Sequence, residues 1–283
     1  MSTHNNIAVL FEDHSNNGLT HDYFAAILDS FKRTAEKKGY NISFLNCDRT
    51  RDNYLTYLEQ VKEKNYDGVV IACIDFNDKE VIELIDSKIP IVTIDEEIEN
   101  VISVKSDNTY GIKNLVDYLV EMGHRRIAYI HGDINYVTNQ RLEGYKEALM
   151  SHNIEVNEEY IRPSEYRDMK KAAYQTEQLL RLKNPPSCIM YSDDYAAIGG
   201  INVLKARGLE IAEDISITGY DGINILAQYE PRLTTVCQNT KSIGRIAAEK
   251  LVEYIENPDN VTIDTTIIDT ILEKGRTVGE EFF

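Results

Sequence analysis

The chain has 283 residues, which is enough to bury one large core or two smaller ones, and we expect two domains. Its 47 acidic residues outnumber its 30 lysines and arginines, so the formal net charge is -17. A surface of this charge repels phosphate backbones and anionic lipid headgroups, so the chain as given is not expected to bind DNA or a membrane surface by itself.

The cysteines and the N-terminus indicate a compartment. Four cysteines lie far apart, with no C-x-x-C motif and no histidine at metal-ligand spacing: Cys47, Cys73, Cys188 and Cys237. We expect free thiols of a reducing compartment, and no metal or other cofactor. No basic segment followed by a long apolar stretch opens the chain, and no run approaches the ~20 apolar residues that span a bilayer. A cytoplasmic protein is therefore expected, unless an upstream segment has been removed.

Short apolar runs alternate with helical patterns through the first hundred residues. Residues 7–11 form a continuous apolar run, as expected for a strand covered on both faces. A helical stripe follows, built from Phe24, Ile27, Leu28 and Phe31, and Gly39 ends it. Further strands are predicted at 42–45, 68–72 and 91–94, with helices at 51–64 and 77–87. This alternation predicts a doubly wound parallel sheet.

A second series of the same kind begins near residue 107. Its first helix carries an apolar stripe and ends at Gly123; the stripe consists of Ile112, Leu115, Val116, Leu119 and Val120. Strands are predicted at 126–130, 188–191 and 216–220, and helices at 139–151, 169–182 and 194–206. A helix at 243–255 and a β-rich segment at 263–278 come last and could return to the first sheet. Without a Gly/Ser/Pro-rich linker, several short crossing segments are expected between the halves.

Acidic residues follow three of the predicted strands. Asp95 follows the strand at 91–94, Asp193 and Asp194 follow 188–191, and Asp221 follows 216–220. Ligands of open α/β sheets bind at this carboxyl edge, although aspartate is also favoured in turns and helix caps. Asp194 fits the cap of the next helix, Asp193 and Asp221 fit a ligand site better, and Asp95 stays open between the two. Ionised carboxylates suit the vicinal hydroxyls of a sugar or ribose, or an amino group.

Other side chains near the same edges are candidates too. Tyr23 and Phe24 open the first helix, and one of them must point away from its apolar stripe; Tyr23 is the preferred pocket residue, and Phe24 is divided between core and pocket. Arg141 stands in the first turn of a helix, where a cation is unfavourable for the macrodipole, so we favour a ligand role over a solvated one. His124, in a helix-to-strand turn, is expected to be solvated or structural.

Motifs of catalysis are missing from the sequence. There is no G-x-S-x-G, H-E-x-x-H, Walker loop or G-x-G-x-x-G, and the six histidines are scattered. An enzyme that used Asp193 and Asp221 as an acid/base pair stays an alternative, because two strand-end carboxylates permit it.

Four stretches, in their order and spacing, resemble the effector-binding domain of the LacI/GalR family of bacterial transcription regulators, which shares its fold with periplasmic sugar-binding proteins. They are SDNTYGIKNLVDYLVEMGHRRIAYIHG (106–132), RLEGYKEAL (141–149), YSDDYAAIGGINVLKARGLEIAEDISITGYDG (191–222) and PRLTTVCQNTKSIGRIAAEKL (231–251). The resemblance implies an α/β fold of two similar doubly wound, Rossmann-like lobes, joined by three crossover segments with a ligand cleft between them. The implied lobes are 1–106 plus 238–266 and 107–237 plus 267–283.

The resemblance also assigns roles to individual residues. Asp221 of GYDG and Asp193 of SDDY look like the effector-contacting acids of the family, and Arg141 of RLEGY looks like its effector-contacting arginine. Tyr23 and Phe24 fall where some members use aromatic residues, and Asp95 falls where some use an acid. These residues form the predicted ligand site.

Family members carry a helix-turn-helix region and a hinge helix before the first strand, whereas only MSTHNN precedes Ile7 here. We therefore expect the DNA-binding region to be absent from this chain. The resemblance predicts an effector-sensing, homodimeric part of a transcriptional regulator that reaches operator DNA only through such an N-terminal domain. A sugar is the expected effector, with purines and nucleosides as runners-up, and a free-standing solute-binding protein of a transporter is the alternative.

Overall fold

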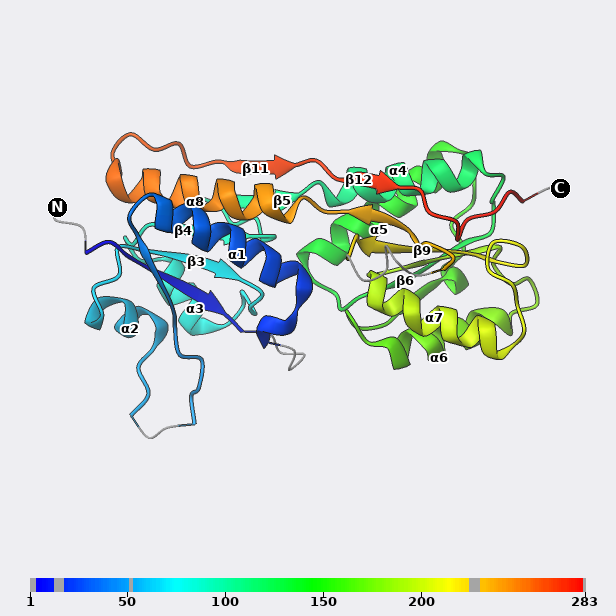
Figure 1. The fold of residues 1–283 in the computed structure, drawn as a ribbon, viewed down its shortest axis with the longest axis horizontal. Helices are drawn as coiled ribbons and strands as arrows, with labels where there is room; N and C mark the ends of the chain where they lie inside the picture. The colour runs from blue at the N-terminus through cyan, green and yellow to red at the C-terminus, as the bar shows by residue number, and fades with distance from the viewer. Residues whose placement is uncertain (1–3, 13–17, 51–52, 224–229, 282–283) are drawn as a thin grey trace. The chain divides into compact units, whose positions relative to one another are not determined.

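The structure is a computed structural model that describes residues 4–12, 18–50, 53–223 and 230–281. Its internal contacts divide the chain into two compact units (Figure 1). Unit 1 comprises Met1–Ser106 and Asn239–Ile268, and unit 2 comprises Asp107–Gln238 and Asp269–Phe283. The chain therefore passes from one unit to the other after residues 106, 238 and 268.

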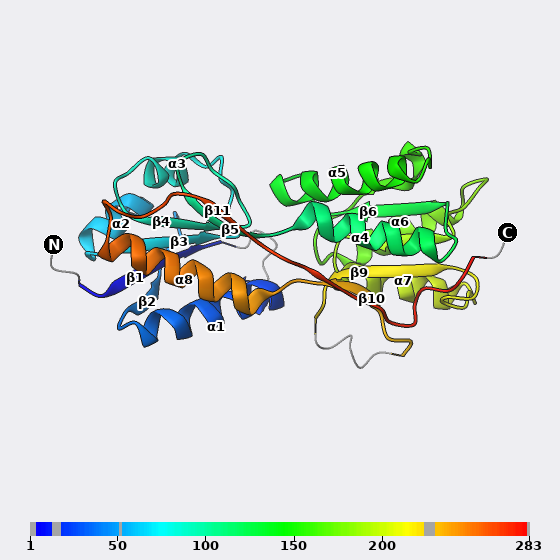
Figure 2. The ribbon, with the colours of Figure 1, turned by 90° about the horizontal axis from the view of Figure 1, so that it is seen from above.

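Unit 1 is a parallel sheet covered by helices on both faces, with the strand order β11-β5-β4-β3-β1-β2. The strands are β1 (Asn6–Phe11), β2 (Asn41–Phe44), β3 (Gly68–Ala72), β4 (Ile91–Ile94), β5 (Ile102–Ser106) and β11 (Thr265–Ile268). The helices are α1 (Asp22–Lys37), α2 (Tyr57–Glu63), α3 (Lys79–Ile85) and α8 (Thr240–Glu256). Figure 2 shows α1 and α8 on one face of this sheet and α2 and α3 on the other, and each face has its own apolar core.

Unit 2 repeats this plan with the strand order β12-β10-β9-β8-β6-β7, in which only β12 is antiparallel to its neighbour among the described strands. Its strands are β6 (Ile127–His131), β7 (Ile161–Pro163), β8 (Cys188–Tyr191), β9 (Ser216–Asp221), β10 (Thr234–Cys237) and β12 (Ile271–Glu273). Its helices are α4 (Asn108–Glu121), α5 (Tyr136–Ser151), α6 (Met169–Leu180) and α7 (Asp194–Ala206). Helices α4 and α5 cover one core, and α6 and α7 cover the other.

The two sheets have the same strand order, so each strand of one unit has a counterpart at the same place in the other unit. Without β11 and β12 the orders read β5-β4-β3-β1-β2 and β10-β9-β8-β6-β7, so β4 in unit 1 corresponds to β9 in unit 2. Asp95 directly follows β4 and Asp221 ends β9. Both aspartates adopt a left-handed backbone, with φ of 63° and 97°. The predicted doubly wound α/β fold is thus confirmed, and the strand-end acids occupy equivalent positions within it.

Most predicted elements are confirmed, and the differences have local causes. Helix α2 begins only after Thr56, whose hydroxyl accepts from the backbone of Glu59 while Glu59 returns a bond to the Thr56 N–H. This capping box fixes the helix start later than the predicted residue 51, which itself lies outside the described residues. Strands β5, β7 and β10 were not predicted. The predicted β-rich segment supplies β11 to the first sheet and β12 to the second.

Two further sequence expectations concern cysteines and membranes. All four cysteines are free thiols, with Cys188 buried and the others half-buried. None of the helices in the described ranges is both long enough and apolar enough to cross a bilayer.

Candidate functional site

Unit 2 brings Arg141, Asp193 and Asp221 to the carboxyl edge of its sheet. Asp193 follows β8, Asp221 ends β9, and Arg141 lies on α5, which follows β6. The guanidinium Nη1 of Arg141 donates to the carbonyl oxygen of Ser192 at 2.9 Å, next to Asp193. Its Cζ lies 3.6 Å from the ring centre of Tyr220, the residue before Asp221. The three predicted residues of this unit therefore belong to one constellation.

Arg141 is a buried cation, not a solvated one, because its exposed fraction is only 3%. Its Nε donates to Asn108 Oδ1 at 2.8 Å, and the ring of Tyr220 covers one face of the guanidinium. Burial alone would lower the pKa of Arg141, but the surrounding Tyr166, Tyr220 and Tyr129 and the Asp221 carboxylate together raise it above the usual range. A permanent positive charge is thus held in a fixed orientation.

Asp221 is held in a turn that only particular residues allow. Its carboxylate Oδ1 accepts from Gln238 Nε2 at 2.6 Å, and its backbone φ is 97°. Gly222 follows with φ of 70°, and a Cβ at that position would lie 2.3 Å from the sulfur of Cys237. The glycine is therefore required both by the backbone and by the close approach of β10.

Asp193 is bonded within the protein at both carboxylate oxygens and is only 1% exposed. Its Oδ1 accepts from the backbone N–H of Ala196 at 2.9 Å and caps α7. Its Oδ2 accepts from Ser192 Oγ and from the backbone N–H of Arg167, each at 2.9 Å. Asp193 thereby fixes the turn after β8 and the segment before α6.

The prediction that Asp194 caps α7 is wrong by one residue. Asp193 has the extended backbone of a cap residue, with φ of -158°, and Asp194 already lies in the helix. The buried Asp194 carboxyl accepts from Thr235 Oγ1 at 2.6 Å and from the N–H of Ile223 at 2.7 Å. Burial raises the pKa of Asp194 well above its ordinary value, although the Thr235 hydrogen bond opposes this. Asp194 thus supports the turn that follows Asp221.

Tyr166 belongs to this constellation but was not predicted. Its ring packs on Gly132 at the end of β6, where an added Cβ would come within 2.4 Å of the ring. Its hydroxyl lies 2.8 Å from Thr138 Oγ1, and its ring centre lies 5.8 Å from Cζ of Arg141. Tyr166 stands in an irregular segment between β7 and α6, where no periodicity marks a residue as important. An aromatic residue among turn residues was the only available signal.

Unit 1 brings Tyr23 and Asp95 together at the carboxyl edge of its own sheet. The Tyr23 hydroxyl donates to Asp95 Oδ2 at 2.7 Å. The Tyr23 ring lies in the α1 core with Ile27 and is buried, so only its hydroxyl end is known to reach the Asp95 carboxylate. Phe24 is the half-buried one, and it contacts Phe11 edge-on with a ring-centre distance of 5.7 Å.

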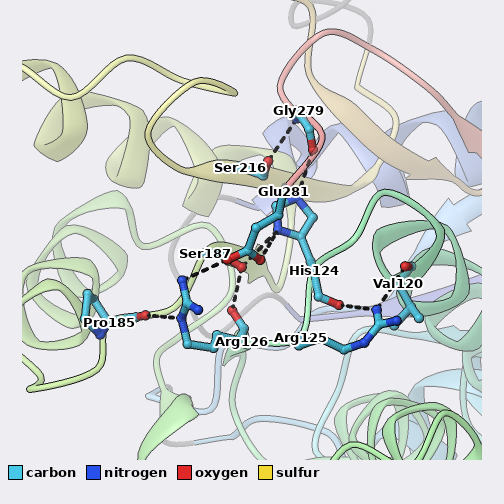
Figure 3. Close-up of polar contacts among 9 residues, drawn as sticks. All are labelled: Val120, His124, Arg125, Arg126, Pro185, Ser187, Ser216, Gly279 and Glu281. Carbon is cyan, nitrogen blue, oxygen red and sulfur yellow. Dashed lines mark hydrogen bonds and ion pairs between the residues drawn. The ribbon is translucent and has the colours of Figure 1, made fainter. Parts of the chain in front are cut away.

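His124 has a structural role, which is one of the two roles that the sequence predicted for it. Figure 3 shows the ring of this 3%-exposed residue between Ser187 Oγ, 2.9 Å from Nδ1, and the carbonyl oxygen of Gly279, 3.1 Å from Nε2. Glu281 contacts the same ring and also pairs with Arg126 at 2.9 Å. The GHRR sequence therefore attaches the C-terminal segment to the ends of α4 and β8.

The chain matches known proteins along most of its length. Residues 116–278 match the family model of a periplasmic binding protein-like domain. The chain is 31% identical over 254 residues to the probable HTH-type transcriptional repressor ExuR of Bacillus subtilis, covering 88% of this chain and 74% of that protein. It is 29% identical over 241 residues to the ribose operon repressor of Haemophilus influenzae, covering 84% and 72%.

A solved structure has the same fold. The crystal structure of a LacI family transcriptional regulator from Enterococcus faecium with bound ribose superposes with a TM-score of 0.83 at 23% identity, over 98% of this chain and 100% of that one. Together with the strand order and the strand-end constellation, these matches show that the chain belongs to the LacI/GalR family of transcriptional regulators and has its periplasmic binding protein-like fold.

Proposed function

We propose that this chain is the effector-sensing part of a LacI/GalR-type transcriptional regulator and that a neutral sugar is its effector. The observation that carries the proposal is the presence of a buried, oriented cation and a strand-end carboxylate in one constellation of unit 2. Arg141 is fixed by Asn108, Ser192 and Tyr220, and Asp221 is fixed by Gln238. Fixed polar groups of opposite charge select a ligand with several hydroxyl groups, which can both donate and accept.

The surroundings of these groups favour a sugar over an anion. A carboxylate such as that of Asp221 suits the hydroxyls of a sugar, and the half-buried aromatic ring of Tyr166 lies near Arg141 in the same constellation. The chain carries a net charge of -17, which disfavours phosphorylated ligands. Relatives support the choice, since one is named a ribose operon repressor and one of the same fold contains ribose. Nucleosides stay the second ligand class, because aromatic rings and acids suit them as well.

Asp95 and Phe24 are proposed as further contacts at the carboxyl edge of unit 1. Asp95 matches Asp221 in sheet position and in backbone conformation, and Phe24 is the partly open aromatic residue of the first helix. Tyr23 is proposed to act through Asp95, which it orients. Asp193 is proposed to support the site from within, because its carboxylate oxygens are already occupied.

Catalysis is not proposed. An acid/base pair of Asp193 and Asp221 would need Asp193 to exchange protons, yet this carboxylate accepts three hydrogen bonds from the protein and is buried. The relatives named above are repressors. We also propose a cytoplasmic homodimer that binds operator DNA through an N-terminal domain outside this chain. Sedimentation of the chain at tens of micromolar should show a dimer, and a duplex DNA should not shift; a monomer or a salt-sensitive shift would contradict this.

A thermal-shift screen tests the sugar proposal. The panel contains ribose and other monosaccharides, disaccharides, sugar phosphates and nucleosides. A ligand at a hundredfold excess over its Kd stabilises the native state by about 2.7 kcal/mol, which gives a measurable shift in Tm. The shift should disappear in Asp221→Asn and in Arg141→Met.

The matched control is Asp214→Asn, an acid that accepts from the backbone N–H of Glu210 before the start of β9 and lies at the opposite end of that strand from Asp221. This variant should keep the ligand-induced shift. Survival of the shift in both site variants would refute the site, and a response to sugar phosphates alone would refute the neutral sugar. A response to nucleosides alone would favour the second ligand class.

A further inference from the structure

Two site residues of unit 2 are bonded to residues that stand where the chain passes between units. The passages lie after Ser106 and after Gln238. Asn108, two positions beyond the first passage, accepts the hydrogen bond from Arg141. Gln238, the last residue before the second passage, donates to Asp221. Each site side chain therefore contacts a different passage.

In the first contact, between Arg141 and Asn108, the residue next to the passage is itself held in place. Asn108 is 1% exposed and begins α4, whose cap is Asp107, the first residue of unit 2 after the passage. The Asp107 carboxylate accepts from the N–H of Tyr110 at 2.9 Å. Asn108 Oδ1 also lies 3.4 Å from the hydroxyl of Tyr220, whose ring covers Arg141. A displacement of Arg141 would therefore strain the start of α4.

The second contact is fixed in a similar way. Gln238 donates its side-chain amide to Asp221 Oδ1 at 2.6 Å and its backbone N–H to the Asp221 carbonyl at 3.4 Å. The next residue, Asn239, belongs to unit 1 and caps α8 by accepting from the N–H of Ser242 at 3.1 Å. Two consecutive side chains thus hold Asp221 in one unit and the first turn of α8 in the other.

We infer that Asn108 and Gln238 are positioning residues that couple Arg141 and Asp221, respectively, to the two passages between the units. A ligand shifts a conformational equilibrium only through groups that it binds differently in the two states. Under the proposed function those groups include Arg141 and Asp221, and the bonds to Asn108 and Gln238 connect them directly to residues at the passages. The inference deepens the proposed function, but its first test needs no ligand.

The ligand-free test is an exchange of hydrogen-bond roles at the second passage. Gln238→Glu places two carboxylates against each other, and Asp221→Asn places two amides there. The combined variant Asp221→Asn/Gln238→Glu restores one donor and one acceptor. Because an amide oxygen at 221 can still accept from Gln238, hydrogen exchange of the backbone amides at 236–241 should rise about tenfold in Gln238→Glu and by less in Asp221→Asn. It should return to within about twofold of the original in the combined variant. Exchange at 236–241 that stays raised in the combined variant would overturn the inference.

The coupling at the first passage is tested by asking whether each variant raises hydrogen exchange at one passage and not at the other. Arg141→Met should raise exchange at 107–110 and leave 239–242 within about twofold, and Asp221→Asn should do the reverse. The control is Gln60→Met, which removes another buried glutamine that makes three hydrogen bonds in unit 1. Equal exchange changes at both passages in every variant would indicate general loosening and would contradict separate coupling.

Ribose is the probe for the ligand-dependent arm. Gln238→Met should weaken ribose binding about tenfold, the effect of about 1.4 kcal/mol, while Gln60→Met changes it less than about twofold. An unchanged affinity in Gln238→Met would count against a positioning role. If ribose binds none of the proteins, its choice as effector fails, and the ligand-free exchange experiments still decide the coupling.

Discussion

Replacement of Asp193 by alanine separates a supporting role from a ligand-contacting one. The substitution removes the cap of α7, which contributes about 1 kcal/mol. It also removes the acceptor of two hydrogen bonds, from the buried Ser192 hydroxyl and from the Arg167 N–H. The loss of each bond costs about 1 to 2 kcal/mol. We therefore expect Asp193→Ala to lower the free energy of unfolding by about 3 to 5 kcal/mol.

Asparagine at the same position provides the graded comparison. Asp193→Asn can keep the cap through its carbonyl oxygen, but its amide group faces the Arg167 N–H, so a loss of about 1 to 2 kcal/mol is expected. Asp107→Ala is the matched control, because this half-buried cap accepts one described side-chain bond, from Tyr110, and should cost about 1 kcal/mol. Urea unfolding followed by circular dichroism measures all three. A loss below 1 kcal/mol in Asp193→Ala would refute the structural assignment and favour a direct ligand contact.

Three further outcomes follow from the geometry. Gly222→Ala should cost about 2 to 3 kcal/mol in urea unfolding, since its Cβ would meet the Cys237 sulfur at a positive φ; wild-type stability would mean that the turn relaxes freely. Burial lowers the pKa of His124, so the unfolded chain binds the proton more readily, and stability should fall as the pH drops below about 6.5. His124→Gln should flatten that dependence, and an unchanged slope would contradict it. Thiol titration should find four groups in denaturant, while Cys188 reacts slowly in the native protein, because burial raises its pKa and blocks access; fewer than four would indicate a disulfide.

The sequence predicted the parts of the fold that depend on local periodicity. Strands such as β3 and β8 are continuous apolar runs because both faces are covered, and helices such as α4 carry a stripe on one face only. Strand β5 was missed because Ser103 and Lys105 leave it only two apolar residues, Ile102 and Val104. In the structure Lys105 is buried and pairs with Glu97, and no local sequence pattern predicts this ion pair. Strand β7 has only three residues, too few for a period to appear.

The residues of the candidate site could be picked out from the sequence, but their contacts with one another could not. Strand ends mark Asp193 and Asp221, and the family resemblance marks Arg141. Which acid caps α7 depends on the backbone at a single residue, and composition cannot distinguish two adjacent aspartates. Asn108 lies 33 positions before Arg141, so their hydrogen bond follows from the fold and not from spacing. Partners of this kind require the packed structure.

The repeat within the chain explains why a strained aspartate recurs in both units. A left-handed backbone at a non-glycine residue costs on the order of 1 kcal/mol and persists where the surrounding structure fixes it, with aspartate tolerated better than most residues. Asp95 and Asp221 share this conformation and the same place in equivalent sheets. They differ in what holds them, since Tyr23 of the first helix donates to Asp95, whereas Gln238 donates to Asp221 from beside a passage between units. The left-handed backbone thus belongs to the fold, and under the proposed function the partner side chain decides which carboxylate is coupled to a passage between the units.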